Sequence, residues 1–284
     1  MSAAPTAALV SADWLASTLD APGIVAIDFR LAADGGRASY EAGHIPGAIH
    51  SDYVGDGWRM KRGNAGGLLP EAGHLSSLFG KLGITPACHV ILCPTGTSAN
   101  DFAAAARAYW TLKHAGHAAV SILDGGTRAW VAGGRALETG ARVPAAGAPY
   151  PICWQPGLRS QADAVAAAIA AQSHVLIDAR SPSYYAGEEK AAEAARAGHI
   201  PGAQNVNYTQ LFDVGTGKLL GLVRLREIFD ALPAKPVITY CNTGHTAALD
   251  WFVLSEVLRQ ADISLYDGSM TEWTEDETRP VETR

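Results

Sequence analysis

The chain contains, at residues 237–254, the stretch VITYCNTGHTAALDWFVL. Its first four residues are mostly apolar and β-branched, which predicts a buried strand. Cys241 follows that strand directly, and Gly244 supplies the conformational freedom that a tight turn requires. The residues after the turn have an amphipathic pattern, which predicts a helix that begins at about Thr246. Ligands of parallel α/β sheets bind at the carboxyl ends of strands, so this turn is the first candidate for a functional site.

Four blocks of sequence occur twice, in the same order, at offsets between 143 and 155 residues. The pairs are VAIDFR (25–30) with VLIDAR (175–180), YEAGHIPGAIHSDY (40–53) with ARAGHIPGAQNVNY (195–208), VILCPTG (90–96) with ITYCNTG (238–244), and SILDGGTRAW (121–130) with SLYDGSMTEW (264–273). Such a repeat indicates two homologous domains. We expect them at 1–140 and 159–284, joined by a linker at 141–158 that is rich in Pro, Gly and Ala.

Strand and helix patterns alternate within each copy. The expected strands are Val25–Phe29, Val90–Leu92, Val120–Leu123, Val175–Asp178, Val237–Tyr240 and Ile263–Tyr266, and the expected helices include Ser11–Leu19, with Ser11 as N-cap, Phe102–His114 and Thr246–Arg259. This alternation predicts an α/β fold in which each domain has a mostly parallel sheet with helices on both faces.

Composition excludes several classes of function. The formal net charge of −6 argues against nucleic acid as a partner. No apolar run approaches the roughly 20 residues that span a bilayer, and the first residues lack a secretory pattern, so the predicted location is the cytoplasm and no membrane partner is expected. The four cysteines form no CxxC pair, which argues against a disulfide framework or a metal site.

The turn after residue 240 has the composition of an anion-binding site. The backbone of Asn242, Thr243, Gly244, His245, Thr246 and Ala247 would fold around one point, so that several N–H groups and the positive end of the helix dipole face the Cys241 sulfur. Such a site stabilises a thiolate, and a thiolate nucleophile needs no neighbouring base. The alternative is a buried cysteine that simply ends a core strand.

The two GHIPGA motifs, the DxR strand ends, the CxxGxTA turn and the DGSxxEW segment together resemble the two-domain thiosulfate and 3-mercaptopyruvate sulfurtransferases, over nearly the whole chain. The resemblance implies two tandem rhodanese-like domains, of which the second is catalytic and the first is not. It implies that Cys241 takes a sulfane sulfur from a small-molecule donor as a persulfide and passes it to cyanide or a thiol. A small thiol-bearing protein is a further candidate acceptor, and no cofactor or metal is implied.

The resemblance leaves the donor open between thiosulfate and 3-mercaptopyruvate. Thiosulfate-specific members have basic residues directly after the cysteine, whereas Asn242 and Thr243 are neutral here. Members specific for 3-mercaptopyruvate use two arginines before the second GHIPGA motif. Tyr184 stands where the first would be, and Arg196 lies too close to Gly198 to match the second.

Asp178 and Arg180 end the strand beside the active turn, and we expect them to brace the loop from beneath, with Arg180 also adding positive potential to the pocket. Tyr184 is a further candidate for support of the pocket or the loop. In the first copy, the block pairs Cys93 with Cys241. Pro94 has no backbone N–H, so a turn after Cys93 would have one fewer amide with which to bind an anion. The distance from Cys93 to the next convincing helix is also longer than in the second copy, and we therefore expect Cys93 to be inactive.

Two other functions remain as alternatives. A cysteine-dependent phosphatase would need an arginine six residues after Cys241, where Ala247 stands. A non-catalytic rhodanese-like sulfur carrier or binding protein is the stronger alternative, because domains of this kind can lose their activity.

Overall fold

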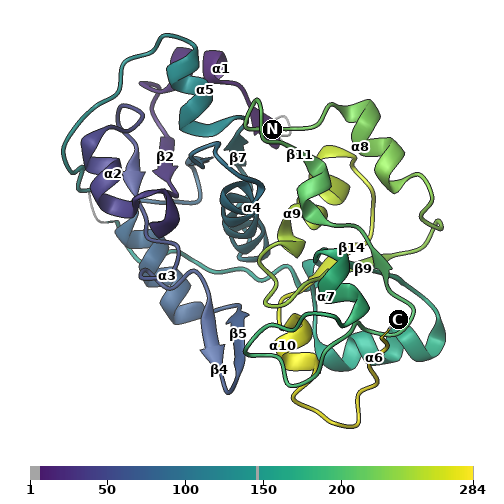
Figure 1. The fold of residues 1–284 in the computed structure, drawn as a ribbon. Coiled ribbons are helices and arrows are strands. Elements are labelled where there is room, and N and C mark those ends of the chain that lie inside the picture. The colour runs from purple at the N-terminus through teal and green to yellow at the C-terminus, as the bar shows by residue number, and fades with distance from the viewer. Residues whose placement is uncertain (1–6, 145–146, 284) are drawn as a thin grey trace. The chain divides into compact units, whose positions relative to one another are not determined.

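The structure is a computed structural model that describes residues 7–144 and 147–283. Within them lie two five-stranded parallel sheets with the same strand order (Figure 1). In spatial order the first is β1 (Leu9–Val10), β7 (Val120–Leu123), β6 (His89–Cys93), β2 (Ile24–Asp28) and β3 (Ile49–His50), and the second is β8 (Arg159–Ser160), β14 (Ile263–Tyr266), β13 (Val237–Tyr240), β9 (Val175–Asp178) and β10 (Gln204–Asn205). This confirms the predicted fold class and the internal repeat.

Two antiparallel hairpins complete the described strands, β4 (Met60–Arg62) with β5 (Ala65–Leu68), and β11 (Phe212–Asp213) with β12 (Lys218–Leu219). Each belongs to a compact unit other than the one that surrounds it in the sequence. The first unit comprises the described residues of Met1–Trp58, Pro70–Trp154 and Phe212–Leu219, and the second those of Arg59–Leu69, Gln155–Leu211 and Leu220–Arg284. The contiguous domains at 1–140 and 159–284 remain a prediction. The compact units differ from these domains at the two hairpins, each of which belongs to the other unit.

Apolar side chains of the first sheet pack against helices on its two faces. On one face, α1 (Ala12–Thr18) and α5 (Gly126–Ala132) contribute Leu15 and Trp130 to a core that includes Ile91 of β6. The long helix α4 (Ala99–His114) is buried along nearly its whole length. As predicted, Ser11 caps α1, because its hydroxyl accepts a hydrogen bond from the Trp14 amide at 3.1 Å.

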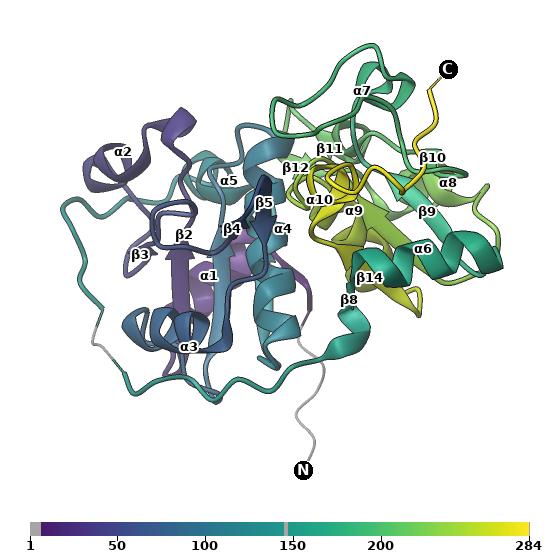
Figure 2. The same cartoon turned by 90° about the horizontal axis from the view of Figure 1, so that it is seen from below.

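The second sheet is covered in the same way (Figure 2). Helices α6 (Ala162–Ala171) and α10 (Ser269–Trp273) share one core with Ile238 and Tyr240 of β13. Helix α9 (Ala247–Phe252) contacts β13 and β14 and continues as one turn of π-helix, Val253–Val257. The helix expected at Thr246–Arg259 is therefore present, but it ends before Arg259, and its second half is π-helix instead of α-helix.

The remaining helices are shorter or lie outside the two cores just described. They are α2 (Gly36–Ala42), α3 (Ala72–Lys81), α7 (Pro182–Ala186) and α8 (Leu222–Phe229), with 3₁₀ turns at Ala32–Asp34, Pro156–Leu158 and Tyr208–Leu211. Within residues 7–144 and 147–283, no helix is both long enough and apolar enough to cross a membrane.

Candidate active site

Cys241 is the first residue after β13, at the carboxyl end of the central strand of the second sheet. Its side chain is 2% exposed. The backbone on both sides of the sulfur is fixed by α10, since the Cys241 amide donates to Ser269 Oγ at 3.0 Å and its carbonyl accepts from the Met270 amide at 3.1 Å. The cysteine therefore has a defined position relative to the turn that follows it.

Five of the six residues predicted to form the loop, Asn242 to Thr246, lie between β13 and α9, and the sixth, Ala247, is the first residue of α9. Gly244 has a φ of +66°, in the left-handed region that favours glycine, as the turn required. The Asn242 carbonyl accepts from the Thr271 amide at 3.0 Å. The side chains of Asn242, Thr243, His245 and Thr246 are half-buried, whereas Gly244 and Ala247 are buried. Anion binding by this loop remains a prediction.

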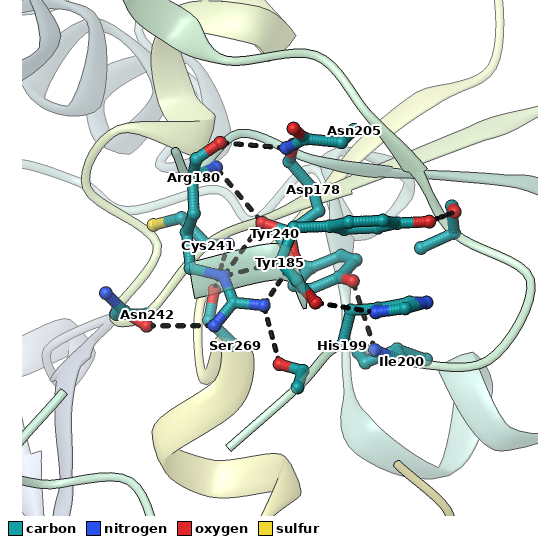
Figure 3. A network of polar contacts seen from close by, with 12 residues as sticks. Asp178, Arg180, Tyr185, His199, Ile200, Asn205, Tyr240, Cys241, Asn242 and Ser269 are labelled. Atoms are coloured by element: carbon teal, nitrogen blue, oxygen red, sulfur yellow. Dashed lines mark hydrogen bonds and ion pairs between the residues drawn. The ribbon is translucent and has the colours of Figure 1, made fainter. Parts of the chain in front are cut away.

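Asp178 and Arg180 form a buried ion pair beside the loop (Figure 3). Arg180 donates through Nε to Asp178 Oδ1 at 2.8 Å and through Nη2 to Asp178 Oδ2 at 2.5 Å. The same Nη2 donates to the Gly198 carbonyl at 2.8 Å, and Nη1 lies 3.4 Å from Asn242 Oδ1. The arrangement ties the loop to the GHIPGA turn and leaves the Arg180 charge largely neutralised by Asp178.

Tyr184 and Arg196 are the two residues of the segment before the second GHIPGA motif that the sequence compared with carboxylate-binding arginines. Tyr184 is half-buried on α7, and Arg196 donates to the Asp276 carbonyl at 2.8 Å. The neighbouring Tyr185 enters the network instead: its hydroxyl donates to the Ala203 carbonyl and its ring stacks on His199 at a centroid distance of 3.8 Å (Figure 3). The sequence reasoning assigned a role to Tyr184 and none to Tyr185.

Ser269 is a site residue that the sequence reasoning missed. Its hydroxyl accepts from the Cys241 amide and donates to the Tyr266 carbonyl at 2.8 Å. Its φ is +52°, an uncommon value for a residue with a Cβ. The repeat could have pointed to this position, because the DGGT and DGSM segments pair Ser269 with a glycine, Gly126, whose φ is +57°.

Two titratable side chains near the sulfur were also missed. Burial raises the pKa of Tyr208, and the charge of Cys241 raises it further. Asp250, on the first turn of α9, is fully buried, and neither carboxylate oxygen has a hydrogen-bond partner among the described residues. Burial raises the pKa of Asp250 well above its ordinary range, and the charges of Cys241 and Asp178 add to the effect.

The hairpin β4–β5 contacts the Cys241 loop within the second unit. Arg59 Nη1 lies 3.4 Å from Thr243 Oγ1. Gly67 has a φ of +97°, and a Cβ at that position would lie 2.1 Å from the Thr243 carbonyl oxygen. A segment from the N-terminal half of the sequence thus completes the surroundings of the loop, which the repeat alone did not predict.

In the first unit, the strand register corrects the alignment of the two cysteines. Cys93 is the last residue of β6 and the Cα partner of Asp28. In the second sheet, the partner of Asp178 is Tyr240. Cys93 therefore corresponds to Tyr240 and not to Cys241, although the letters of the two blocks match.

Pro94 is the residue that occupies the place of Cys241. Its carbonyl accepts from the Thr127 amide at 2.9 Å, just as the Cys241 carbonyl accepts from Met270. The expectation of a longer loop was wrong: α4 begins at Ala99, so the first loop has the five residues 94–98, whereas the second has the six residues 241–246.

Cys93 lies inside the sheet and packs in the core that α1 and α5 cover. Burial raises the pKa of its thiol well above the ordinary value, and the charge of Asp28 raises it further. A cysteine held as a neutral thiol in a core is a poor nucleophile. The geometry thus agrees with the expected inactivity of Cys93 but gives it a different cause.

A carboxylate fills the loop of the first unit. Asp101, the third residue of α4, accepts from the Thr95 amide at 3.0 Å and from the Gly96 amide at 2.7 Å. Burial raises the pKa of Asp101 to about 6 against these hydrogen bonds. The third residue of α9 is Leu249, which has no group that could bind loop amides in this way.

The profile of the rhodanese-like domain matches residues 11–133 and 161–276. The chain therefore belongs to the rhodanese-like family and contains two such domains, as the sequence predicted.

Two curated relatives resemble the chain over almost its full length. A thiosulfate sulfurtransferase of Pseudomonas aeruginosa is 33% identical over 271 residues, which cover 94% of either chain. The sulfur carrier protein TtuD of Thermus thermophilus is 32% identical and covers 93% of either chain.

The crystal structure of the 3-mercaptopyruvate sulfurtransferase SseA from Escherichia coli has a TM-score of 0.79 and 31% identity, and the match covers 93% of this chain and 99% of that one. The predicted class of enzyme, a sulfurtransferase, is confirmed by these relatives.

Proposed function

We propose that this protein moves a sulfane sulfur from thiosulfate or 3-mercaptopyruvate to cyanide or a thiol, through a persulfide on Cys241. The observation that carries the proposal is the position of Cys241 at the start of a loop that both α10 and the Arg180 network hold in place. Backbone amides and the N-terminus of the following helix favour an anionic sulfur at such a position.

With thiosulfate, the Cys241 thiolate attacks the outer sulfur. A bond forms between the two sulfurs, the sulfur–sulfur bond of thiosulfate breaks, and sulfite leaves with the electron pair. The product is the Cys241 persulfide anion, whose negative charge the loop would continue to stabilise.

With 3-mercaptopyruvate, the thiolate takes the sulfur from the donor's CH₂ group. The carbon–sulfur bond breaks toward the adjacent carbonyl, and the enolate that results takes up the thiol proton to give pyruvate. In either case, cyanide or a thiolate then attacks the outer sulfur of the persulfide, and Cys241 returns to the thiolate form.

Sulfur delivery to a small thiol-bearing protein is the second candidate function. It is supported by the 32% identity to a sulfur carrier protein over nearly the whole chain. The chemistry at Cys241 would be the same and only the acceptor would differ. We place both functions in the cytoplasm, where the cysteine composition suits a reducing compartment.

The test is thiocyanate production from cyanide with each donor, in the wild type, Cys241→Ser and Cys93→Ser. We expect Cys241→Ser to have no measurable transfer, because serine cannot form a persulfide, whereas Cys93→Ser should stay within about twofold of the wild type. Transfer by Cys241→Ser at the wild-type rate would contradict the proposal. The ratio of kcat/KM for the two donors identifies the preferred one.

A further inference from the structure

The Cys241 loop contains no lysine or arginine of its own. Both proposed donors are anions, yet the two residues after Cys241 are the neutral Asn242 and Thr243. The guanidinium of Arg180 already pairs with Asp178 through Nε and Nη2. An arginine that binds the donor at this loop, in addition to the backbone amides, would come from another element.

The hairpin β4–β5 supplies such a group. Arg59, which directly precedes β4, lies with Nη1 3.4 Å from Thr243 Oγ1, and Thr243 is two residues from Cys241. The guanidinium is half-buried at the edge of the loop. Its charge is therefore screened less than that of an arginine extended into solvent.

Arg59 is held at this place by contacts along the hairpin. The close approach of Gly67 to the Thr243 carbonyl leaves no space for a side chain between the hairpin and the loop. The Leu69 amide donates to Asp267 Oδ2 at 2.7 Å, and the Asn64 amide donates to Glu275 Oε1 at 2.7 Å. These hydrogen bonds fix the hairpin to the part of the second unit that also holds Ser269.

We propose that Arg59 binds the anionic group of the sulfur donor, either the sulfonate-like oxygens of thiosulfate or the carboxylate of 3-mercaptopyruvate. The proposal rests on the function given above and adds the residue that recognises the donor. A guanidinium presents several N–H donors in a planar fork, which suits both groups. The donor's charged end then binds Arg59 while its transferable sulfur faces Cys241.

The first experiment measures KM and kcat for both donors in Arg59→Met, Arg59→Lys and Arg62→Met. Arg62 is the matched control, because it lies on the same hairpin but is exposed to solvent. We expect Arg59→Met to raise KM by about ten- to a hundredfold, the range that loss of a charge-assisted hydrogen bond produces, while kcat changes less than about threefold. Arg59→Lys should restore part of the affinity, and Arg62→Met should resemble the wild type.

The second experiment needs no turnover. The rates at which Cys241 is alkylated by iodoacetate, an anion, and by iodoacetamide, its neutral analogue, are compared in the same variants. We expect the iodoacetate-to-iodoacetamide ratio to fall about tenfold in Arg59→Met and to stay unchanged in Arg62→Met, because the guanidinium attracts the anionic reagent alone.

The two measurements separate failure of this inference from failure of the proposed function. Transfer that survives Cys241→Ser would overturn the function, whatever Arg59 does. An unchanged KM and an unchanged alkylation ratio in Arg59→Met would overturn the role of Arg59 and leave the function standing. A loss of kcat in Arg59→Met at an unchanged alkylation ratio would also overturn it, since it would show a structural role.

Discussion

The two loops that follow the central strands, 94–98 and 241–246, begin from similar sequences and end as different structures. In the first, the cysteine is the last residue of the strand and its side chain belongs to the core. In the second, the cysteine is the first residue of the loop. Both thiols are buried, but one residue of register separates a cysteine packed in the core beneath α1 and α5 from one that begins a loop, because successive side chains of a strand point to opposite faces.

The same two loops also differ in what occupies their amides. Asp101 returns from α4 to accept from Thr95 and Gly96, so the first loop already holds a carboxylate. Leu249 stands at the corresponding helix position in the second unit and has no carboxylate with which to bind loop amides. In the copy that we expect to be inactive, the loop is thus retained and a carboxylate of the same unit binds its amides.

The most severe test of this comparison is Leu249→Asp. A carboxylate at the third position of α9 should bind the loop amides as Asp101 does, and we expect thiocyanate production to fall about a thousandfold, the scale on which preorganised N–H donors act. Leu249→Asn has the same shape without the charge and should retain far more activity. Equal loss in the two variants would show that the buried position, rather than the charge, is responsible.

The filled loop can be examined through Asp101→Asn. Because the pKa of Asp101 is raised to about 6, the folded protein keeps this proton between pH 4 and 6 while the unfolded chain loses it. The group therefore favours the folded state at low pH, and that contribution is lost as the pH rises through this range, by up to about 3 kcal/mol.

Urea unfolding of the wild type and Asp101→Asn from pH 4 to 7.5 measures this effect. We expect the unfolding free energy of the wild type, minus that of Asp101→Asn, to fall as the pH rises across that interval. A difference that does not depend on pH would mean that Asp101 is ionised throughout and binds the amides more strongly than its burial indicates.

Gly244→Val addresses the geometry of the second loop without changing any reactive atom. A left-handed backbone costs a residue with a Cβ about 1–2 kcal/mol, and valine is among the least tolerant. We expect unfolding free energy to drop by about that amount and turnover to drop about tenfold. Gly221→Ala is the control, since Gly221 has a φ of −61° and open space around its Cβ position. Wild-type turnover in Gly244→Val would count against the loop geometry as a cause of activity.

The local pattern of apolar and turn residues was sufficient to predict several strands of the fold with their bounds. The predicted strands Val120–Leu123, Val175–Asp178, Val237–Tyr240 and Ile263–Tyr266 coincide with β7, β9, β13 and β14. These strands are buried on both faces, so their apolar runs are continuous and bounded by turn residues. The start of α4 was predicted three residues too late, because Ser98 caps the helix in a stretch that contains few apolar residues.

The amino-acid sequence by itself determined the repeat, the α/β class and the family, together with Cys241 and the loop residues as the candidate site. These follow from periodicity and from short motifs, which are local properties. Only the tertiary structure decided that Cys93 lies one register position away from Cys241, that Ser269 fixes the Cys241 amide, and that Arg59 reaches Thr243 from a hairpin in the other half of the sequence. Each depends on strand pairing or on contacts between distant segments, and a pattern of neighbouring residues carries no information about either.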